Sequence, residues 1–234
     1  MFAIYKREMR SYFTTPIGYI FAAVYLALGA AVFCYSTLYA LSADTGTYFT
    51  IMLFSLVVLL PLLTMKTFSE ERKSRTEQLL LSAPVTLTGM VLGKFLAAFS
   101  VFFGCTLLSS LNFIILYRHA EPNTAMILGN LLALLLVGMA FLAIGMLVSA
   151  LTESQLSAAV ITVAVLLLLM VISFANSLIG VRWLRFLLSG LSVFARFQNF
   201  TNGIFDVAAV VYYLSLTALF LFLCVRVYDR RRYA

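Results

Sequence analysis

One short segment of this sequence, residues 66–77, is unusually rich in charged side chains. Seven of its twelve residues carry charge, and they are Lys66, Glu70, Glu71, Arg72, Lys73, Arg75 and Glu77. Two of the acids precede basic residues by three and four positions, which favours ion pairs along a helix and suits the helix dipole. A mere turn would not need the roughly 20 residues from 66 to 85. We therefore expect a helix here, either a solvated surface helix or a docking element for a partner protein.

Catalytic and metal-binding patterns are missing from the sequence. The single histidine, His119, belongs to no H-E-x-x-H motif, and the three cysteines lie in apolar runs without metal-ligand spacing. Gly93-Lys94 could belong to a phosphate-binding P-loop, G-x-x-x-x-G-K-[ST]. That motif needs glycine at position 88 and serine or threonine at position 95, but this sequence has Thr88 and Phe95 there. Lys94 is instead expected to snorkel towards lipid headgroups. We expect no enzyme activity, no metal and no cofactor bound by this chain itself.

The composition indicates a membrane protein. Of 234 residues, 63% are hydrophobic and only 11% are charged, whereas soluble domains have about 45–50% apolar and about 25% charged residues. This excludes a soluble globular enzyme and a disordered chain. The net charge of +7 could attract nucleic acid, but the basic residues flank apolar runs. We therefore expect membrane lipids as partners and no nucleic acid.

Six stretches without Asp, Glu, Lys, Arg or His are long enough to cross a hydrocarbon layer of about 30 Å as helices. They are residues 17–41, 48–65, 95–117, 126–151, 155–178 and 207–225. Strands of a membrane β-barrel would alternate between polar and apolar residues over about 10 positions. These runs are longer and show no such alternation, which argues against a β-barrel. The sequence thus predicts an all-α integral membrane protein with a single domain, 1–234, and six transmembrane helices.

The distribution of basic residues predicts the orientation. Twelve Lys and Arg residues lie on the side of the two termini, and four lie on the other side. Because cytoplasmic loops carry the excess of Lys and Arg, both termini are expected in the cytoplasm.

Two shorter segments are expected to be helical outside the spans. In residues 1–15, one side of a helix would be apolar and the other would carry Lys6, Arg7 and Arg10. This predicts an interfacial helix on the inner leaflet, ending before Pro16; a segment that only sets orientation is the alternative. Residues 179–206 have apolar residues at helical spacing with interspersed arginines, which predicts short external helices.

Polar side chains within the spans are few. The asparagines are Asn112, Asn130 and Asn176. Each could bond between helices or line a pathway. No acid, base or histidine lies within a predicted span, which disfavours an ion channel or an ion-coupled carrier. The small residues Gly138, Gly145 and Ser149 share one face of the fourth span and predict a close helix contact.

Residues 68–85, F-S-E-E-R-K-S-R-T-E-Q-L-L-L-S-A-P-V, combine two acids, a basic cluster, a Thr-Glu pair, a leucine run and a small residue before Pro-Val. This pattern resembles the membrane subunits of ABC-2-type exporters, although Arg75 stands where that family often has glycine. Three further features also match this family: Gly93-Lys94, the turn at 149–155 and the segment 199–206. The opening residues 12–19 look most like the gliding-motility type of permease.

This resemblance implies that the chain is the permease subunit of an ATP-driven exporter and forms half of the translocation pathway. The partners would be two cytosolic ABC ATPase subunits, which bind ATP and Mg, and a second permease, identical or related. The membrane would be the bacterial cytoplasmic (inner) membrane. The ATPase-coupling residues would be Glu70, Glu71, Arg72, Lys73, Arg75, Thr76 and Glu77, with Glu153 in a second contact. A six-span structural protein without a transport role is the alternative.

Overall fold

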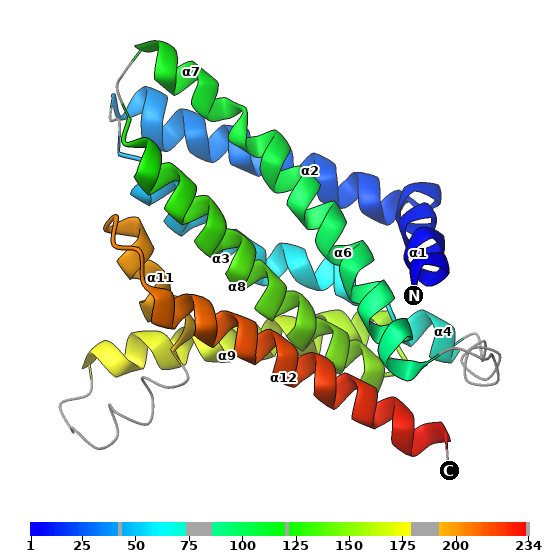
Figure 1. Cartoon of the computed structure of the whole chain (residues 1–234). Helices are drawn as coiled ribbons and strands as arrows, with labels where there is room; N and C mark the ends of the chain where they lie inside the picture. Colours follow the sequence, from blue (N-terminus) through cyan, green and yellow to red (C-terminus); the bar gives the residue numbers. More distant parts are fainter. Residues whose placement is uncertain (42–43, 74–85, 120–121, 179–191, 233–234) are drawn as a thin grey trace.

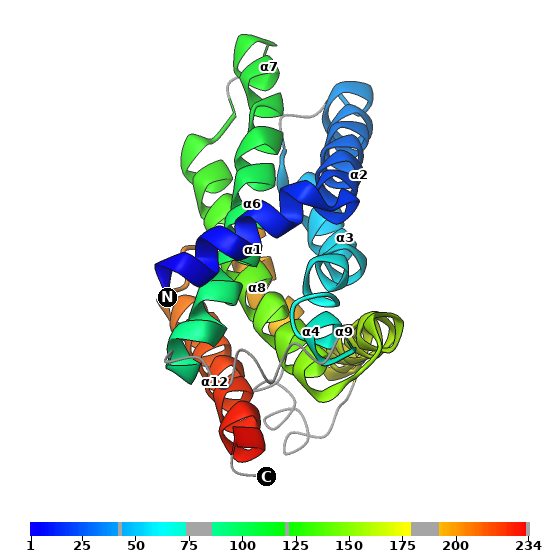
Figure 2. The ribbon, with the colours of Figure 1, turned by 90° about the vertical axis from the view of Figure 1, so that its right-hand side faces the viewer.

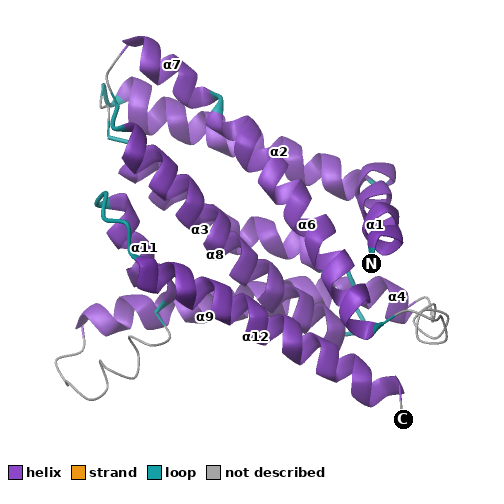
Figure 3. Ribbon diagram, in the orientation of Figure 1, coloured by secondary structure: helices purple, strands orange, loops and turns teal. Residues whose placement is uncertain are grey.

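The computed structural model is built of helices. It describes residues 1–41, 44–73, 86–119, 122–178 and 192–232, and within these ranges no strand occurs (Figure 3). Six of the helices are long and apolar enough to cross a membrane. The predicted fold class, an all-α membrane protein with six spans, is confirmed.

The helices follow the predicted order. They are α1 (Phe2–Thr14), α2 (Pro16–Phe33) with a π-helical continuation (Cys34–Tyr39), α3 (Gly46–Thr64), α4 (Ser69–Lys73), α6 (Leu87–Ser110), α7 (Asn112–His119), α8 (Thr124–Leu151), α9 (Gln155–Leu178), α11 (Val193–Thr201) and α12 (Val207–Arg232). The helix that carries the third predicted span begins before that span, because α6 begins at Leu87 and includes Lys94. The Thr86 hydroxyl accepts the N–H of Gly89 at 3.3 Å and caps the helix there.

The bundle is arranged around α8. In α8, 72% of the apolar stretch is buried, the largest share among the six candidate spans. Both termini, α1 and α4 lie at one end of the bundle (Figure 1). We call this the basic end, since most Lys and Arg residues flank the spans on this side. Figure 2 shows α1 running across α6 at that end.

Helix α1 packs part of its apolar side against the bundle itself, and its place on the inner leaflet stays a prediction. The Tyr5 hydroxyl donates to Ser100 of α6 at 3.1 Å. The buried Tyr12 donates to the carbonyl of Leu63 in α3 at 2.9 Å. Phe2, by contrast, remains 77% exposed. An amphipathic pattern predicts a helix with one face shielded from water, but this face can pack against either protein or lipid.

One short helix lies in the segment expected to carry external helices. Helix α11 is at the opposite end of the bundle from α1 (Figure 1), and residues 179–191 lie outside the described residues. The Asp206 carboxylate accepts the side-chain N–H of Asn199 at 2.9 Å and backbone N–H groups at the start of α12. The bond from Asn199 is the largest cause of a pKa of Asp206 below its usual value. These bonds join the end of α11 to the start of α12.

The three span asparagines differ in their surroundings. Asn130 of α8 is fully buried, and neither of its side-chain polar atoms has a hydrogen-bond partner among the described residues. Asn112 begins α7 and is half-buried. The side chain of Asn176 lies outside the described part of the chain. Roles in a pathway or between helices stay predictions for all three.

Glycines bring α8 into close contact with its neighbours. A Cβ at Gly138 would overlap the ring of Phe102 in α6, and a Cβ at Gly145 would overlap the side chain of Thr64 in α3. Gly129 faces open space, since nothing lies within 4 Å of a Cβ built there. The predicted close contact of this face of α8 therefore occurs within one chain, where it allows backbones to approach.

Substitution of Gly145 tests this contact. Gly145→Ala should destabilise the protein by about 1–3 kcal/mol, because α3 and α8 must move apart to admit the methyl group. Gly129→Ala on the same helix is the matched control and should be neutral or slightly stabilising. The free energy of unfolding in detergent micelles, followed by circular dichroism, measures both. Equal stabilities for the two variants would contradict the contact.

Candidate functional site

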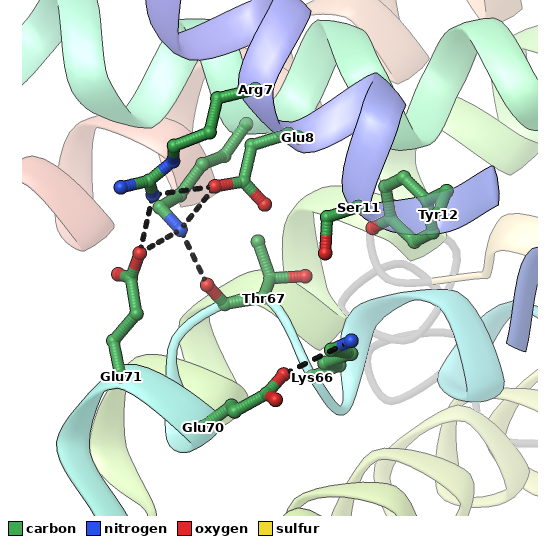
Figure 4. Close-up of a pocket in the computed structure, with 9 residues that line it drawn as sticks. Arg7, Glu8, Ser11, Tyr12, Lys66, Thr67, Glu70 and Glu71 are labelled. Carbon is green, nitrogen blue, oxygen red and sulfur yellow. Dashed lines mark hydrogen bonds and ion pairs between the residues drawn. The ribbon is translucent and has the colours of Figure 1, made fainter. Parts of the chain in front are cut away.

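Four charged side chains meet at the basic end. Arg7 and Glu8 come from α1, Glu71 comes from α4, and Lys94 comes from α6. The Arg7 guanidinium lies 2.7 Å from Glu8 Oε1 and 2.6 Å from Glu71 Oε1. The Lys94 ammonium lies 3.2 Å and 2.9 Å from the same two oxygens. We call these four residues the ion-pair ring; Figure 4 shows Arg7 and Glu8 above Glu71.

Lys94 is buried inside this ring, which corrects the expectation that it snorkels to headgroups. Its side chain is only 1% exposed. The ammonium also donates to the carbonyl of Thr67 at 2.8 Å and lies 5.1 Å from the centre of the Phe68 ring. Snorkelling is blocked because α1 and the turn between α3 and α4 cover this side of α6. A buried charge needs partners, and the ring supplies two carboxylates.

Glu8 was missed by the sequence reasoning. Burial alone would raise the pKa of its carboxyl group, but Lys94 and Arg7 outweigh burial, so the pKa of Glu8 lies below its usual value. Glu8 follows the buried Ile4 by four positions and precedes the buried Tyr12 by four. Residues four apart share one face of a helix, so this spacing could have identified Glu8 as inward-facing.

Backbone and side-chain bonds fix α4 to the turn between α8 and α9. The Ser149 hydroxyl of α8 accepts the N–H groups of Phe68 and Ser69 at 3.1 Å and 3.2 Å. Arg72 lies 2.7 Å from the Glu153 carboxylate and donates to the carbonyl of Leu151 at 3.2 Å. The structure thus brings together Arg72 and Glu153, two of the predicted coupling residues.

The remaining predicted site residues lie elsewhere. Glu70 pairs with Lys66 at 3.3 Å, one turn before it. Lys73 is exposed at the end of α4, and Lys6 and Arg10 are exposed on α1. Arg75, Thr76 and Glu77 lie outside the described residues.

The four residues of the ring link three helices around a small cavity. The ring borders a cavity of about 270 Å³, which is also lined by Lys66 and Glu70. The two acids and two bases of the ring balance in charge. In the part of the chain that the structure describes, no group of His, Cys, Asp or Glu could hold a metal ion. What the ring does is join α1, α4 and α6 through charged contacts.

Removal of Lys94 tests the ring. Lys94→Met removes one of the two cations that contact the Glu8 and Glu71 carboxylates, and loss of one partner from a buried ion pair costs about 3–5 kcal/mol. Since the Glu8 and Glu71 side chains are 14% and 17% exposed, we expect the lower end of this range. Lys73→Met, at the exposed end of α4, should change the free energy of unfolding by about 0.5 kcal/mol or less. Equal effects in detergent would contradict the assignment.

Comparison with known proteins places the chain in a family. The model of the ABC-2 family transporter proteins matches residues 35–226. A search of curated proteins finds no match. The matched range includes α4, Lys94 and the turn between α8 and α9, and the finer likeness to gliding-motility permeases stays a prediction. Because the match covers most of the sequence, this chain belongs to the ABC-2 family of transporter proteins and is a membrane-spanning transporter permease.

Proposed function

We propose that this permease exports its substrate with energy from a separate ATPase subunit that docks at α4. The charged bonds of α4 are the observation that carries the proposal. Glu71 joins α4 to α1 and α6, while the Ser149 hydroxyl joins its first residue to α8 and Arg72 joins it to Glu153 in the turn before α9. A force applied to α4 would therefore reach α1, α6, α8 and this turn without any chemistry inside the membrane.

The proposed assembly contains two permease chains, identical or related, and two ATPase subunits. ATP and Mg would bind to the ATPase subunits, since this chain has no P-loop. The basic end would face the cytoplasm of a bacterial cell across the inner membrane, in line with the excess of Lys and Arg on that side. This places α1, α4 and both termini where a cytosolic ATPase can reach them.

The contacts also select the residues that a partner could use. Glu71 is engaged within the chain, so reversal of its charge would disturb the fold as well as any docking. Lys73 projects from α4 and is exposed. It is therefore the sharper probe of a protein contact.

The orientation is tested by labelling. In a variant without the natural cysteines, Arg230→Cys and Thr124→Cys place exposed thiols near opposite ends of the bundle. A membrane-impermeant maleimide should label Thr124→Cys in intact cells and Arg230→Cys only after permeabilisation. The reverse pattern would place the basic end outside the cell.

The docking proposal is tested by charge reversal. Lys73→Glu should lower the ATPase activity of the purified permease–ATPase complex about tenfold, the scale of a lost interfacial charge contact of about 1.4 kcal/mol. Arg118→Glu, exposed at the opposite end, is the control and should leave the activity unchanged. If the complex stays intact and the ATPase activity is unchanged in both variants, the proposal that the ATPase docks at α4 is wrong.

A further inference from the structure

A groove of about 660 Å³ lies between the first turns of α6 and the second half of α12. Its inner wall is apolar, with Val91 and Leu92 from α6 and Leu221, Phe222 and Val225 from α12. Neither the ion-pair ring nor the bonds of α4 use these residues. The groove is therefore a separate feature of the bundle, and its occupant is independent of the proposed coupling to an ATPase.

The polar residues of the groove are all at one of its ends. Thr86 and Thr88 precede or begin α6, and Arg226 and Asp229 lie near the end of α12, so all four are at the basic end. At 1.5 Å per residue, the stretch of α12 from Ala218 to Asp229 covers about 16 Å. This is close to half of the hydrocarbon thickness of about 30 Å. The groove thus has the polarity and the depth of one lipid leaflet.

This depth favours a lipid over a protein helix as the occupant. A membrane-spanning helix from another chain would contact its partner over most of the hydrocarbon layer. The groove provides an apolar wall over one leaflet only, and it ends in polar side chains. An amphiphile with one apolar part and one polar head has the matching shape.

The polar end presents one positive and one negative charge side by side. Arg226 Nη1 lies 3.7 Å from Asp229 Oδ2, and the two side chains are 62% and 41% exposed. An exposed pair at this distance contributes little to stability, so either member can readily take another partner. Guanidinium groups bind phosphate well, and a carboxylate attracts an ammonium group. Together they match a zwitterionic phosphoethanolamine head.

We propose that the groove between α6 and α12 binds one phospholipid with a phosphoethanolamine head, from the leaflet at the basic end. Its phosphate contacts Arg226, its ammonium group contacts Asp229, and an acyl chain lies along Ala218, Leu221 and Val91. The lipid fills the groove that α6 and α12 line.

Native mass spectrometry of the full-length chain tests the proposal. The chain is purified in detergent and titrated with phosphatidylethanolamine or phosphatidylglycerol. We expect one tightly bound phosphatidylethanolamine per chain. Arg226→Gln should weaken its binding about tenfold, the effect of losing one charge-assisted hydrogen bond. Arg230→Gln, an exposed arginine of α12 outside the groove, should have no effect. Asp229→Asn should remove the preference for phosphatidylethanolamine over phosphatidylglycerol.

A second pair of variants tests the apolar wall. Ala218→Trp fills the groove and should abolish retention of the lipid, whereas Leu223→Trp, exposed on α12 outside the groove, should retain it. If Ala218→Trp lowers the thermal stability, Leu92→Trp fills the groove from α6 instead. Equal retention in the groove-filling variant and Leu223→Trp would overturn the proposal. A bound molecule without phosphate would also overturn the proposal. A disulfide-linked dimer formed by Phe222→Cys in native membranes would overturn it too, because it would place a second copy of the chain in the groove.

Discussion

A buried ammonium group decides how the basic end of this permease is built. Lys94 lies within α6 and is almost fully enclosed, and an unpaired charge in such a place is very unfavourable. Two carboxylates must come to it from other elements. Glu8 comes from α1 and Glu71 from α4. Arg7 contacts the same oxygen of each carboxylate that Lys94 contacts. One side chain of α6 thus ties the N-terminal helix and α4 together, in addition to the bonds that Tyr5 and Tyr12 make from α1 and that Ser149 and Arg72 make at α4.

The rest of the bundle relies on close packing. Lipid chains are as apolar as leucine, so association of helices in a bilayer depends on how closely their surfaces fit. The contacts of Gly138 with Phe102 and of Gly145 with Thr64 provide this fit for α8. Ser149, on the same face, accepts two N–H groups of the turn into α4. One face of α8 therefore both packs the core and holds the segment proposed to receive the ATPase.

The spans could be predicted from the sequence because charged residues rarely enter a bilayer, and α8 and α9 begin and end close to the predicted positions. At α6 the same criterion started the span after Lys94, whereas the helix begins at Leu87 and the protein itself supplies carboxylates to this lysine. The partners of Lys94 could not be predicted either. They come from segments 86 and 23 positions away in the chain, and helical periodicity carries no information about contacts at that range. For α1, the periodicity predicted a covered face but not whether protein or lipid covers it.

The ion-pair ring also bears on how pieces of such permeases can be exchanged. Its members come from three segments, and each of its two carboxylates is shared between the Arg7 guanidinium and the Lys94 ammonium. A chimera whose α1 came from a relative without an acid at position 8 would leave the buried ammonium of Lys94 with one carboxylate in place of two. Residues 7, 8, 71 and 94 would have to be transferred together, so that this end of the molecule behaves as one inseparable module despite being scattered along the polypeptide.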